Sequence, residues 1–363
     1  MGQSQKNNNI YQVTGLMSGT SLDGVDVAFC TFILKDGKWD YTIEKAENVT
    51  YSNEWKTRLS NLENASAIEF VRTDAEYGHY LGKITKEFHQ KHNIKPDFIA
   101  SHGHTIFHRP EINCTSQIGN GSAIAADTGV PVVCDFRSAD VALGGQGAPL
   151  VPIGDHLLFD DFDYCLNLGG IANISFKRSG NRIAFDICPV NIVLNHLSSF
   201  LHKDYDENGM SARNGLICQP LLIKLNNLEF YRKQPPKSLG KEWILLEVYP
   251  FMERFDIPVE DKLRTFTEHI ACQIANVVRS ANQSAILVTG GGAFNSFLIE
   301  RIRERTGINL ILPDPLTINF KEAMIFAFLG VLRWRKEINC LKSCTGATHD
   351  NIGGAIYQVF SER

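Results

Sequence analysis

The sequence of 363 residues carries 36 lysine and arginine residues against 40 aspartate and glutamate residues, a formal charge of −4, with 44% hydrophobic and 21% charged residues. This composition is typical of a globular protein and excludes the disordered and fibrous classes. At roughly 150 residues per domain, the length predicts about two domains. The basic residues are scattered, so the charge pattern gives no reason to expect nucleic acid or an anionic membrane surface as a partner. Chemistry on a small molecule is the default expectation.

No stretch approaches the roughly 18 apolar residues of a membrane helix, and the N-terminal MGQSQKNNNIYQ is polar where a secretory signal would be apolar. We therefore expect a cytoplasmic protein without a membrane segment. The nine cysteines are an odd number, and most stand in apolar runs such as VPVVCDF, which indicates buried, reduced thiols. Cys340 and Cys344 lack a second pair at zinc-ligand spacing, which disfavours a structural zinc there.

The first part of the chain alternates strand and helix patterns. Residues 11–34 predict a strand, a glycine-rich turn and a second strand, and residues 66–92 carry apolar side chains near helical spacing. FIASHG at 98–103 and PVVCDF at 131–136 indicate buried strands. This alternation predicts an α/β fold.

The same pattern starts again about 150 residues later. Residues 164–175 predict a strand, a glycine turn and a strand, and RIAFDICPV predicts another strand. An apolar helical face between Leu263 and Val277 leads into the strand SAILVTGGG and a helix from Asn295, and a last apolar helix covers about 321–334. The chain is therefore expected to be internally duplicated. The proline-containing stretch 231–243 is interpreted as a mobile loop.

Three glycine-rich bends could bind phosphate, because glycine lets backbone N–H groups approach an anion and hydroxyl side chains add donors. The first bend contains Ser18, Gly19, Thr20, Ser21, Leu22, Asp23, Gly24, Val25 and Asp26. The other two contain Gly169, Gly170 and Asn173, and Gly290, Gly291 and Gly292. Each bend alone is explained as well by a tight turn, but three in one chain favour nucleotide binding. The absence of G-x-x-x-x-G-K-[ST], G-x-S-x-G and H-E-x-x-H excludes the P-loop, common esterase and zinc-protease signatures.

Several long motifs carry a resemblance to a known family. MSGTSLDGVD at 17–26, SHGHT at 101–105, QIGNG at 117–121, DFRSADVALGGQGAPLVP at 135–152, LNLGGIANIS at 166–175 and VTGGGAFN at 288–295 are similar to motifs of the anhydro-N-acetylmuramic acid kinase family. The resemblance runs from residue 13 to about 330. It implies two duplicated ribonuclease-H-like domains, as in the sugar kinase, Hsp70 and actin (actin-like ATPase) superfamily, with ATP in an interdomain cleft.

We expect the first domain at residues 1–135 and the second at 136–363, with the last segment packing back on the first domain. A homodimer is implied by the resemblance alone. The resemblance further implies an ATP-dependent kinase that hydrolytically opens 1,6-anhydro-N-acetylmuramic acid and phosphorylates O6. The product, N-acetylmuramic acid 6-phosphate, belongs to peptidoglycan recycling.

This reaction needs a general base, because water must attack the anomeric carbon while the departing O6 takes the γ-phosphoryl group. The family places its base in a Phe-Asp pair at a strand end, and the match here is Asp186. Cys188 and Val190 stand where the family commonly carries glycine, so added bulk beside the sugar is expected. Pro189 and Asn191 are kept, and we place Asn191 among the substrate contacts.

The resemblance implies that Glu322 lines the sugar site, and His104 stands in place of a common glutamine. Contact with the sugar through His102 or His104 is also expected. Arg137 and Asp140 could clamp the lactyl carboxylate or the sugar, because arginine offers a planar fork; an ion pair between the two is an equal alternative. Glu322 could instead lie on a solvated helix surface. His102, His104 and His108 also allow a zinc hypothesis, which ranks below sugar contact.

ATP with Mg²⁺ is expected, because phosphoryl transfer requires the developing charge to be neutralised. Asp23 and Asp26 are candidates to hold the metal through water, and no direct metal ligand is certain. Two other functions remain open. One is a kinase for an ordinary open hexosamine, in which Asp186 deprotonates the hydroxyl directly; the other is a non-catalytic sensor of sugar or nucleotide.

Overall fold

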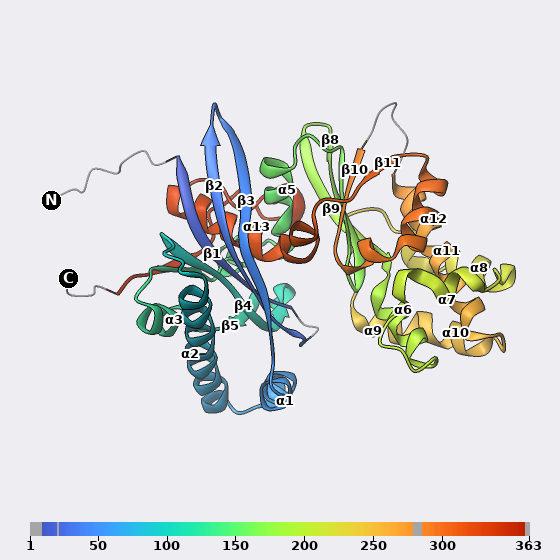
Figure 1. Cartoon of the computed structure of the whole chain (residues 1–363), viewed down its shortest axis with the longest axis horizontal. Coiled ribbons are helices and arrows are strands. Elements are labelled where there is room, and N and C mark those ends of the chain that lie inside the picture. Colours follow the sequence, from blue (N-terminus) through green and yellow to red (C-terminus); the bar gives the residue numbers. More distant parts are fainter. Residues whose placement is uncertain (1–8, 20–21, 279–284, 360–363) are drawn as a thin grey trace. The chain divides into compact units, whose positions relative to one another are not determined.

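The computed structural model describes residues 9–19, 22–278 and 285–359, and its chain forms two compact units. Unit 1 comprises Met1–Leu158 and Phe320–Arg363, and unit 2 comprises Phe159–Asn319. Figure 1 labels many of the elements of both units. The first division falls after Leu158 rather than at the predicted 135/136, because the intervening segment packs within unit 1. Its helix α5 (Val151–Leu158) contacts strand β3 (Lys38–Thr50).

Unit 1 is built on a mixed sheet in the order β12-β6-β4-β1-β2-β3, with β5 paired to β4. The first three strands in the chain are antiparallel neighbours, and β4 and β6 add in parallel on the other side of β1. The strands other than β3 are β1 (Ile10–Ser18), β2 (Gly24–Lys35), β4 (Phe98–Arg109), β5 (Cys114–Ile118), β6 (Val132–Cys134) and β12 (Ala355–Tyr357).

Unit 2 repeats this topology in its own sheet, ordered β11-β10-β7-β8-β9. Here β7, β8 and β9 are antiparallel neighbours, and β10 and β11 add in parallel beside β7. The strands are β7 (Tyr164–Leu168), β8 (Ile171–Arg178), β9 (Asn181–Pro189), β10 (Ala285–Thr289) and β11 (Asn309–Ile311). The predicted duplication is confirmed, since five strands of unit 1 and five of unit 2 share one order and one set of directions. Each unit has the ribonuclease-H-like arrangement that the resemblance implies.

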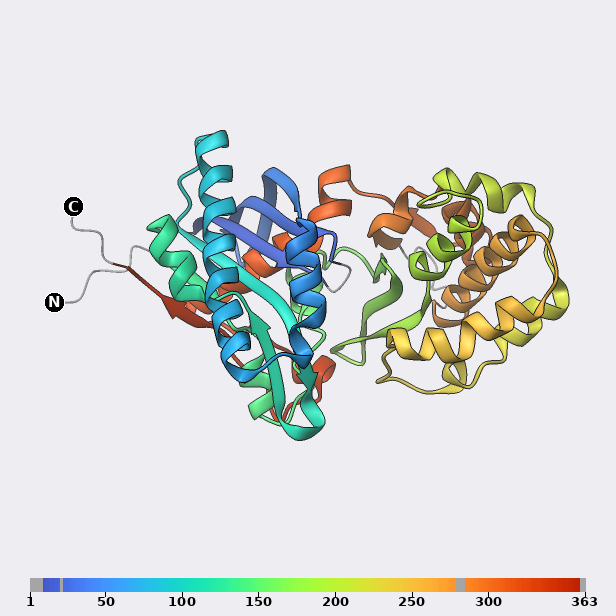
Figure 2. The same ribbon diagram turned by 90° about the horizontal axis from the view of Figure 1, so that it is seen from below.

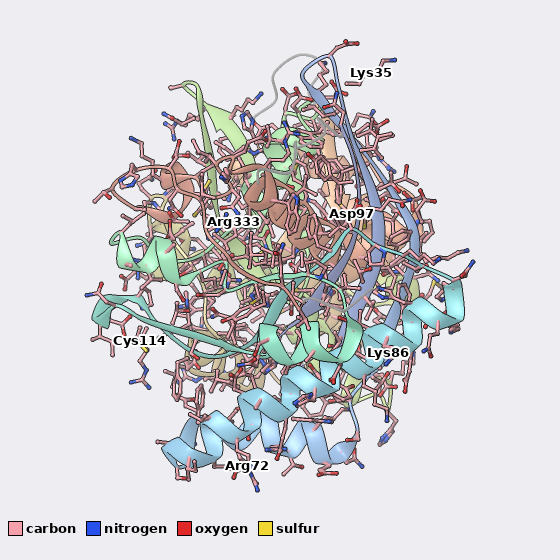
Figure 3. All side chains as sticks on the ribbon, turned by 90° about the vertical axis from the view of Figure 1, so that its left-hand side faces the viewer. Lys35, Arg72, Lys86, Asp97, Cys114 and Arg333 are labelled. Atoms are coloured by element: carbon pink, nitrogen blue, oxygen red, sulfur yellow. The ribbon has the colours of Figure 1, made fainter. Side chains whose placement is uncertain are left out.

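Helix α2 (Ala67–His92) covers one face of the unit 1 sheet and matches the predicted helix closely. The hydroxyl of Ser66 accepts a hydrogen bond from the Glu69 N–H, and Asn93 ends the helix in a left-handed conformation, as capping preferences require. Its apolar side packs on Leu16 of β1 and the neighbouring strand residues. Its charged side faces outward, where Figure 3 labels Arg72 and Lys86.

Helix α13 (Pro315–Arg335) covers the opposite face, because successive residues of a strand point to opposite sides. Gly15, beside Leu16, meets the backbone of Ala323, and the ring of Phe32 lies 5.3 Å from that of Phe328. By length and composition α13 could span a membrane, contrary to the expectation that no such stretch exists. However, 72% of its most apolar window is buried inside the structure, which its role as the core helix of unit 1 explains.

The other helices of unit 1 are short: α1 (Asn53–Asn61), α3 (Gly121–Thr128), α4 (Ser138–Ala142) and α14 (Lys342–Thr345). In unit 2 the helices gather on one side of the sheet (Figures 1 and 2). They are α6 (Asn191–Ser199), α7 (Met210–Asn214), α8 (Gln219–Asn226), α9 (Lys241–Trp243), α10 (Tyr249–Arg254), α11 (Val259–Val277) and α12 (Ser296–Thr306). The predicted helix around Leu263 is α11, whose buried residues belong to the core of unit 2.

All nine cysteines are free thiols, as expected. Cys114, Cys218 and Cys272 are half-buried and the others are buried. Figure 3 labels Cys114, which begins β5.

We expect Gly15→Ala to destabilise the protein by about 3 kcal/mol, because a Cβ there would lie 2.1 Å from the Ala323 carbonyl oxygen in α13. Gly37→Ala is the control, since nothing lies within 4 Å of its added Cβ and only its φ of +78° opposes the change. That control should cost about 1 kcal/mol. Urea unfolding followed by circular dichroism measures both, and equal losses would contradict close packing of α13 on β1.

Candidate functional site

The first glycine-rich bend joins β1 to β2 in unit 1. Thr20 and Ser21 lie outside the described residues. Leu22 has a left-handed backbone, and its N–H donates to the Gly19 carbonyl at 3.4 Å. A Cβ on Gly24 would lie 2.5 Å from the Val49 carbonyl oxygen, so glycine is required where β3 passes the start of β2. The predicted hairpin is therefore present, with its two ends fixed by backbone contacts.

The hydroxyl of Ser18 is held within unit 1 rather than left open. Its Oγ lies 2.6 Å from the Tyr51 hydroxyl and 2.7 Å from His104 Nδ1, and Tyr51 in turn lies 2.5 Å from the Tyr77 hydroxyl. Burial lowers the pKa of His104 to about 4, so the imidazole is neutral at pH 7. The Ser18 hydroxyl and the His104 imidazole are thus hydrogen-bonded to each other. A phosphate bound at this bend would therefore contact backbone N–H groups first.

Two carboxylates stand at the start of β2. Asp26 Oδ1 accepts a hydrogen bond from the Asn48 amide at 2.8 Å. Burial raises the pKa of Asp26, the Asn48 hydrogen bond lowers it, and repulsion from Asp23 raises it further. The two side chains therefore lie within electrostatic reach of each other, as a shared cation would require.

Glu322, on α13, is within electrostatic reach of Asp26. Burial raises its pKa, and the negative charge of Asp26 raises it further. The ammonium of Lys321 and the guanidinium of Arg137 oppose that rise. Unit 1 thus brings Glu322 and Asp26 together, although 296 residues separate them in the sequence.

His102 and Arg137 bind one another. His102 Nδ1 donates to the Gly103 carbonyl at 2.9 Å, so Nε2 is the acceptor for the Arg137 Nε and Nη2 groups at 3.0 and 2.8 Å. Arg137 Nη1 donates to the Gly147 carbonyl at 2.6 Å. Burial and the nearby Arg137 hold the pKa of His102 well below its usual value. The Arg137 guanidinium, which was predicted to clamp a carboxylate, is thus already hydrogen-bonded within unit 1 through Nε, Nη1 and Nη2.

Asp140 lies inside unit 1, with a side chain that is 0% exposed. Oδ2 accepts from the Gly147 N–H at 2.8 Å. Oδ1 accepts from Cys340 Sγ, Thr345 Oγ1 and the Asn351 amide at 3.0, 2.9 and 2.9 Å. The predicted sugar contact at Asp140 is not what the structure places there, and neither is an ion pair with Arg137. The carboxylate instead ties the GGQG loop to the C-terminal segment.

The histidine cluster does not assemble into a metal site. His108 Nδ1 lies 3.2 Å from Thr115 Oγ1, while the nitrogens of His102 are bound as described above. Across residues 9–19, 22–278 and 285–359, no group of three or more His, Cys, Asp or Glu side chains could hold a metal ion. The described residues therefore give the zinc hypothesis no support. Binding of a metal through water at Asp23 and Asp26 stays a prediction.

In unit 2 the Gly169–Gly170 turn separates β7 from β8. The Gly169 carbonyl accepts from the Asn191 N–H at 3.2 Å, and the Gly170 carbonyl accepts from the Val190 N–H at 2.8 Å and the Ile192 N–H at 3.3 Å. Because C=O and N–H point in opposite directions across a trans peptide, the Gly170 N–H is directed away from α6. That orientation suits an anion outside the turn.

The third bend packs on the end of β7. Gly290 has φ +82°, and an added Cβ would lie 2.4 Å from Asn167 Oδ1; one on Gly292 would lie 2.8 Å from the Cβ of Leu168. The Asn191 amide donates to the Leu168 carbonyl at 3.1 Å. The two glycine bends of unit 2 and Asn191 are therefore gathered at one end of β7.

The predicted helix after this bend begins as expected. A 3-10 turn covers Gly291–Phe294. The side chain of Asn295 then caps α12 by accepting the Leu298 N–H at 2.9 Å.

Asp186 stands on β9, the edge strand of the unit 2 sheet, directly across from Asn173 on β8. Its N–H donates to the Lys237 carbonyl at 3.1 Å, and its Oδ2 accepts the Leu239 N–H at 2.9 Å. Burial raises the pKa of Asp186, and the hydrogen bond from Leu239 lowers it. The stretch predicted to be a mobile loop thus contacts the proposed base at two atoms.

Cys188 and Val190 are both 0% exposed and belong to the apolar core of unit 2. The expectation that they add bulk beside a sugar is wrong for the side chains themselves, since these are packed inside the unit.

The predicted residues divide between the two units as follows. Those in unit 1 are Ser18, Gly19, Leu22, Asp23, Gly24, Val25, Asp26, His102, His104, Arg137, Asp140 and Glu322, and those in unit 2 are Gly169, Gly170, Asn173, Asp186, Asn191, Gly290, Gly291 and Gly292. Sequence analysis missed Tyr51, Tyr77, Lys237 and Leu239. The two tyrosines stand far from any motif, and Lys237 and Leu239 act through backbone atoms, which leave no signature in residue type.

We expect Tyr51→Phe to lower the free energy of unfolding by about 1–2 kcal/mol, because it leaves the buried Ser18 and Tyr77 hydroxyls without a shared partner. Tyr80→Phe is the control, since its ring contacts Tyr51 at 6.1 Å and its removal of a hydroxyl leaves the Ser18–Tyr51–Tyr77 chain intact. Urea unfolding is the measurement. Equal stability of the two variants would refute a structural role for this hydroxyl chain.

Comparison with known proteins bears on these observations. The family model described as anhydro-N-acetylmuramic acid kinase matches residues 11–359. Anhydro-N-acetylmuramic acid kinase of Sulfurimonas denitrificans is 32% identical over 95% of this chain and 98% of its own length, and that of Sulfurovum sp. is 34% identical over 94% and 98%. Among solved structures, the activator of the 2-hydroxyisocaproyl-CoA dehydratase from Clostridium difficile with bound ADPNP is 13% identical, with a TM-score of 0.43 over 90% of this chain and 97% of that chain. On the family match and these relatives, the chain belongs to the anhydro-N-acetylmuramic acid kinase family.

Proposed function

We propose that this chain is an ATP-dependent kinase that hydrolytically opens 1,6-anhydro-N-acetylmuramic acid and phosphorylates its O6. The match of the family model across residues 11–359 is the observation that carries the proposal. The product is N-acetylmuramic acid 6-phosphate, and the metabolic setting is peptidoglycan recycling. The enzyme is a phosphotransferase with an alcohol group as acceptor.

In this proposal Asp186 is the general base. Water attacks the anomeric carbon and loses a proton to the carboxylate of Asp186. The bond from that carbon to O6 breaks, and O6 takes the γ-phosphoryl group while ADP leaves. The carboxylate must be ionised for the first step, and the Leu239 N–H that donates to its Oδ2 favours the charged form.

We assign the nucleotide phosphates to backbone N–H groups of the two hairpin turns, the bend from Ser18 to Asp26 and the Gly169–Gly170 turn. Support comes from the outward Gly170 N–H. Asn173, beside Asp186 in the sheet register, and the turn of Gly290, Gly291 and Gly292 complete the predicted nucleotide contacts.

Mg²⁺ fits the chemistry of the Asp23 and Asp26 carboxylates, which are hard oxygen donors that repel each other. Bound with ATP, it would neutralise charge that develops on the phosphates. Asp23 and Asp26 would hold it through water, and Asn48 would keep the Asp26 carboxylate oriented.

For the sugar, we retain His102, His104, Asn191, Arg137 and Glu322 as candidate contacts, with Arg137 acting from its place against His102. Asp140 is assigned instead to holding the GGQG loop. A cytoplasmic location and a homodimeric state complete the proposal. Sedimentation of the purified chain tests the oligomeric state.

The substrate test measures ADP release with the 1,6-anhydro sugar and with plain N-acetylmuramic acid. We expect turnover that requires the anhydro bridge. Equal turnover on the plain sugar would instead identify a kinase for ordinary hexosamines. Binding of ATP and sugar without turnover of either substrate would identify a sensor.

Asp186→Asn should lower kcat by about 10²–10⁴-fold with little change in KM, because the amide cannot accept the proton from water. Asp163→Asn is the matched control, since Asp163 also lies in unit 2 and its carboxylate also accepts a backbone N–H, from Ala285 at 3.3 Å. The control should retain wild-type kcat. Full activity of Asp186→Asn would exclude Asp186 as the base.

A further inference from the structure

The proposed base is contacted by a short segment of which the reaction scheme above uses a single group, the Leu239 N–H. This segment, residues 235–240, joins the turn that ends at Arg232 to helix α9, and we call it the strap. It lies along β9, which is the edge strand of its sheet. An edge strand presents unpaired backbone groups, and the Asp186 N–H finds its partner in the strap, at the Lys237 carbonyl, 3.1 Å away.

The strap also contacts the carboxylate of Asp186. The Leu239 N–H donates to Asp186 Oδ2 at 2.9 Å. Main chain and side chain of Asp186 are therefore both bound by a segment more than 50 residues away in the sequence. Two contacts on one residue restrict its position and its side-chain rotation together.

The strand itself is irregular at this point. Asn173 pairs with Asp186 while Ala172 pairs with Cys188, so Ile187 is an extra residue on β9. Such a bulge re-aims the neighbouring side chain. The bulge sets the direction of the Asp186 carboxylate, and the strap holds it there.

The strap is anchored on both sides of its contact with Asp186. Leu239 is 8% exposed. The Lys237 ammonium lies 4.7 Å from the centre of the Phe230 ring and 5.9 Å from that of Phe185. It also donates to the Phe230 carbonyl at 3.4 Å. These cation–π contacts link the strap to the residue that precedes the base.

Among the described residues, the titratable groups near Asp186 include Cys188 and, interacting with it, Lys237 and Tyr231. Cys188 on β9 interacts electrostatically with both Asp186 and Lys237, and Tyr231 interacts with Cys188. Burial raises the pKa of the Cys188 thiol and of the Tyr231 hydroxyl, so both stay neutral near pH 7. The hydrogen bond from Leu239 is therefore the specific interaction that opposes the desolvation of the Asp186 carboxylate.

We propose that the strap is a positioning element for the catalytic base: the Leu239 N–H fixes Oδ2 of Asp186 and stabilises the carboxylate, and Oδ1 receives the proton of the attacking water. Lys237 secures the strap through its ring contacts and its carbonyl. This inference rests on the proposed function for its kinetic consequence. The contact itself can be tested without turnover.

The kinetic test compares Leu239→Pro, which removes the N–H, with Leu239→Ala, which keeps the N–H and removes the buried side chain. Loss of the donor raises the pKa of Asp186, and a base is active only when deprotonated. The acid limb of the kcat profile should therefore move to higher pH by about one unit in Leu239→Pro, with kcat about tenfold lower below that limb. The profile of Leu239→Ala should keep its acid limb where the wild type has it.

Gln234→Pro is the proline control. It lies just before the strap, and the preceding Lys233 has φ −68° and ψ 136°, an extended backbone that tolerates a following proline. Its acid limb should match that of the wild type. Coincident limbs in Leu239→Pro and Leu239→Ala would overturn the proposal.

Hydrogen exchange measured by mass spectrometry supplies a test that needs no activity and no proline variant. In Asp186→Ala the Leu239 N–H loses its acceptor, so peptides covering 235–240 should exchange faster than in the wild type, while Asp163→Ala leaves them unchanged. Unchanged exchange in Asp186→Ala would refute the strap contact. If Asp186→Ala exchanges faster but the wild-type chain shows no sugar turnover, the contact is upheld and the proposed function is rejected instead.

Discussion

In the proposed enzyme, the central physical constraint is that the Asp186 carboxylate must stay charged while it is partly removed from water. Burial favours the neutral form of Asp186, and a neutral carboxyl group cannot accept a proton. The fold opposes this effect of burial with a hydrogen bond from the Leu239 N–H. A hydrogen bond from a neutral donor stabilises the charged carboxylate without neutralising it, so the other oxygen, Oδ1, remains basic.

The duplicated sheet explains where such groups can be placed. In each unit the first strand ends in a glycine-containing bend that leads into an antiparallel second strand, β1 to β2 and β7 to β8. The two bends are secured differently. Side-chain hydroxyls of Ser18, Tyr51 and Tyr77 fix the end of β1, whereas the Gly169 and Gly170 carbonyls are fixed by N–H groups that open α6. The two units thus share the frame but not the contacts that secure it.

Patterns local in sequence predicted much of this frame. The hairpin after Tyr11, helix α2 and the repeated strand order follow from apolar periodicity and glycine positions, which act over a few residues. The sequence did not predict the contacts of residues whose partners lie far away in the chain. The segment before α9 was predicted to be a mobile loop; residues 233–240 do form a loop and their mobility stays a prediction, but no local pattern indicated that its carbonyl and N–H groups bind Asp186 on a strand some 50 residues earlier. Asp140 looked like a ligand because Arg137 stands beside it, yet its four partners include Cys340, Thr345 and Asn351.

The same dependence on distant partners governs the charges of unit 1. Burial and the negative charge of Asp26 favour the protonated form of Glu322, and the Lys321 ammonium and the Arg137 guanidinium oppose this effect. Arg137 is kept in place by His102 and Gly147, so its positive charge is fixed instead of free to swing toward a ligand. A fixed cation acts through its field. In the proposed enzyme Arg137 would contact the sugar from this fixed position and, together with the Lys321 ammonium, would favour the charged form of Glu322. His102, neutral because of burial and the adjacent guanidinium, holds that cation in place.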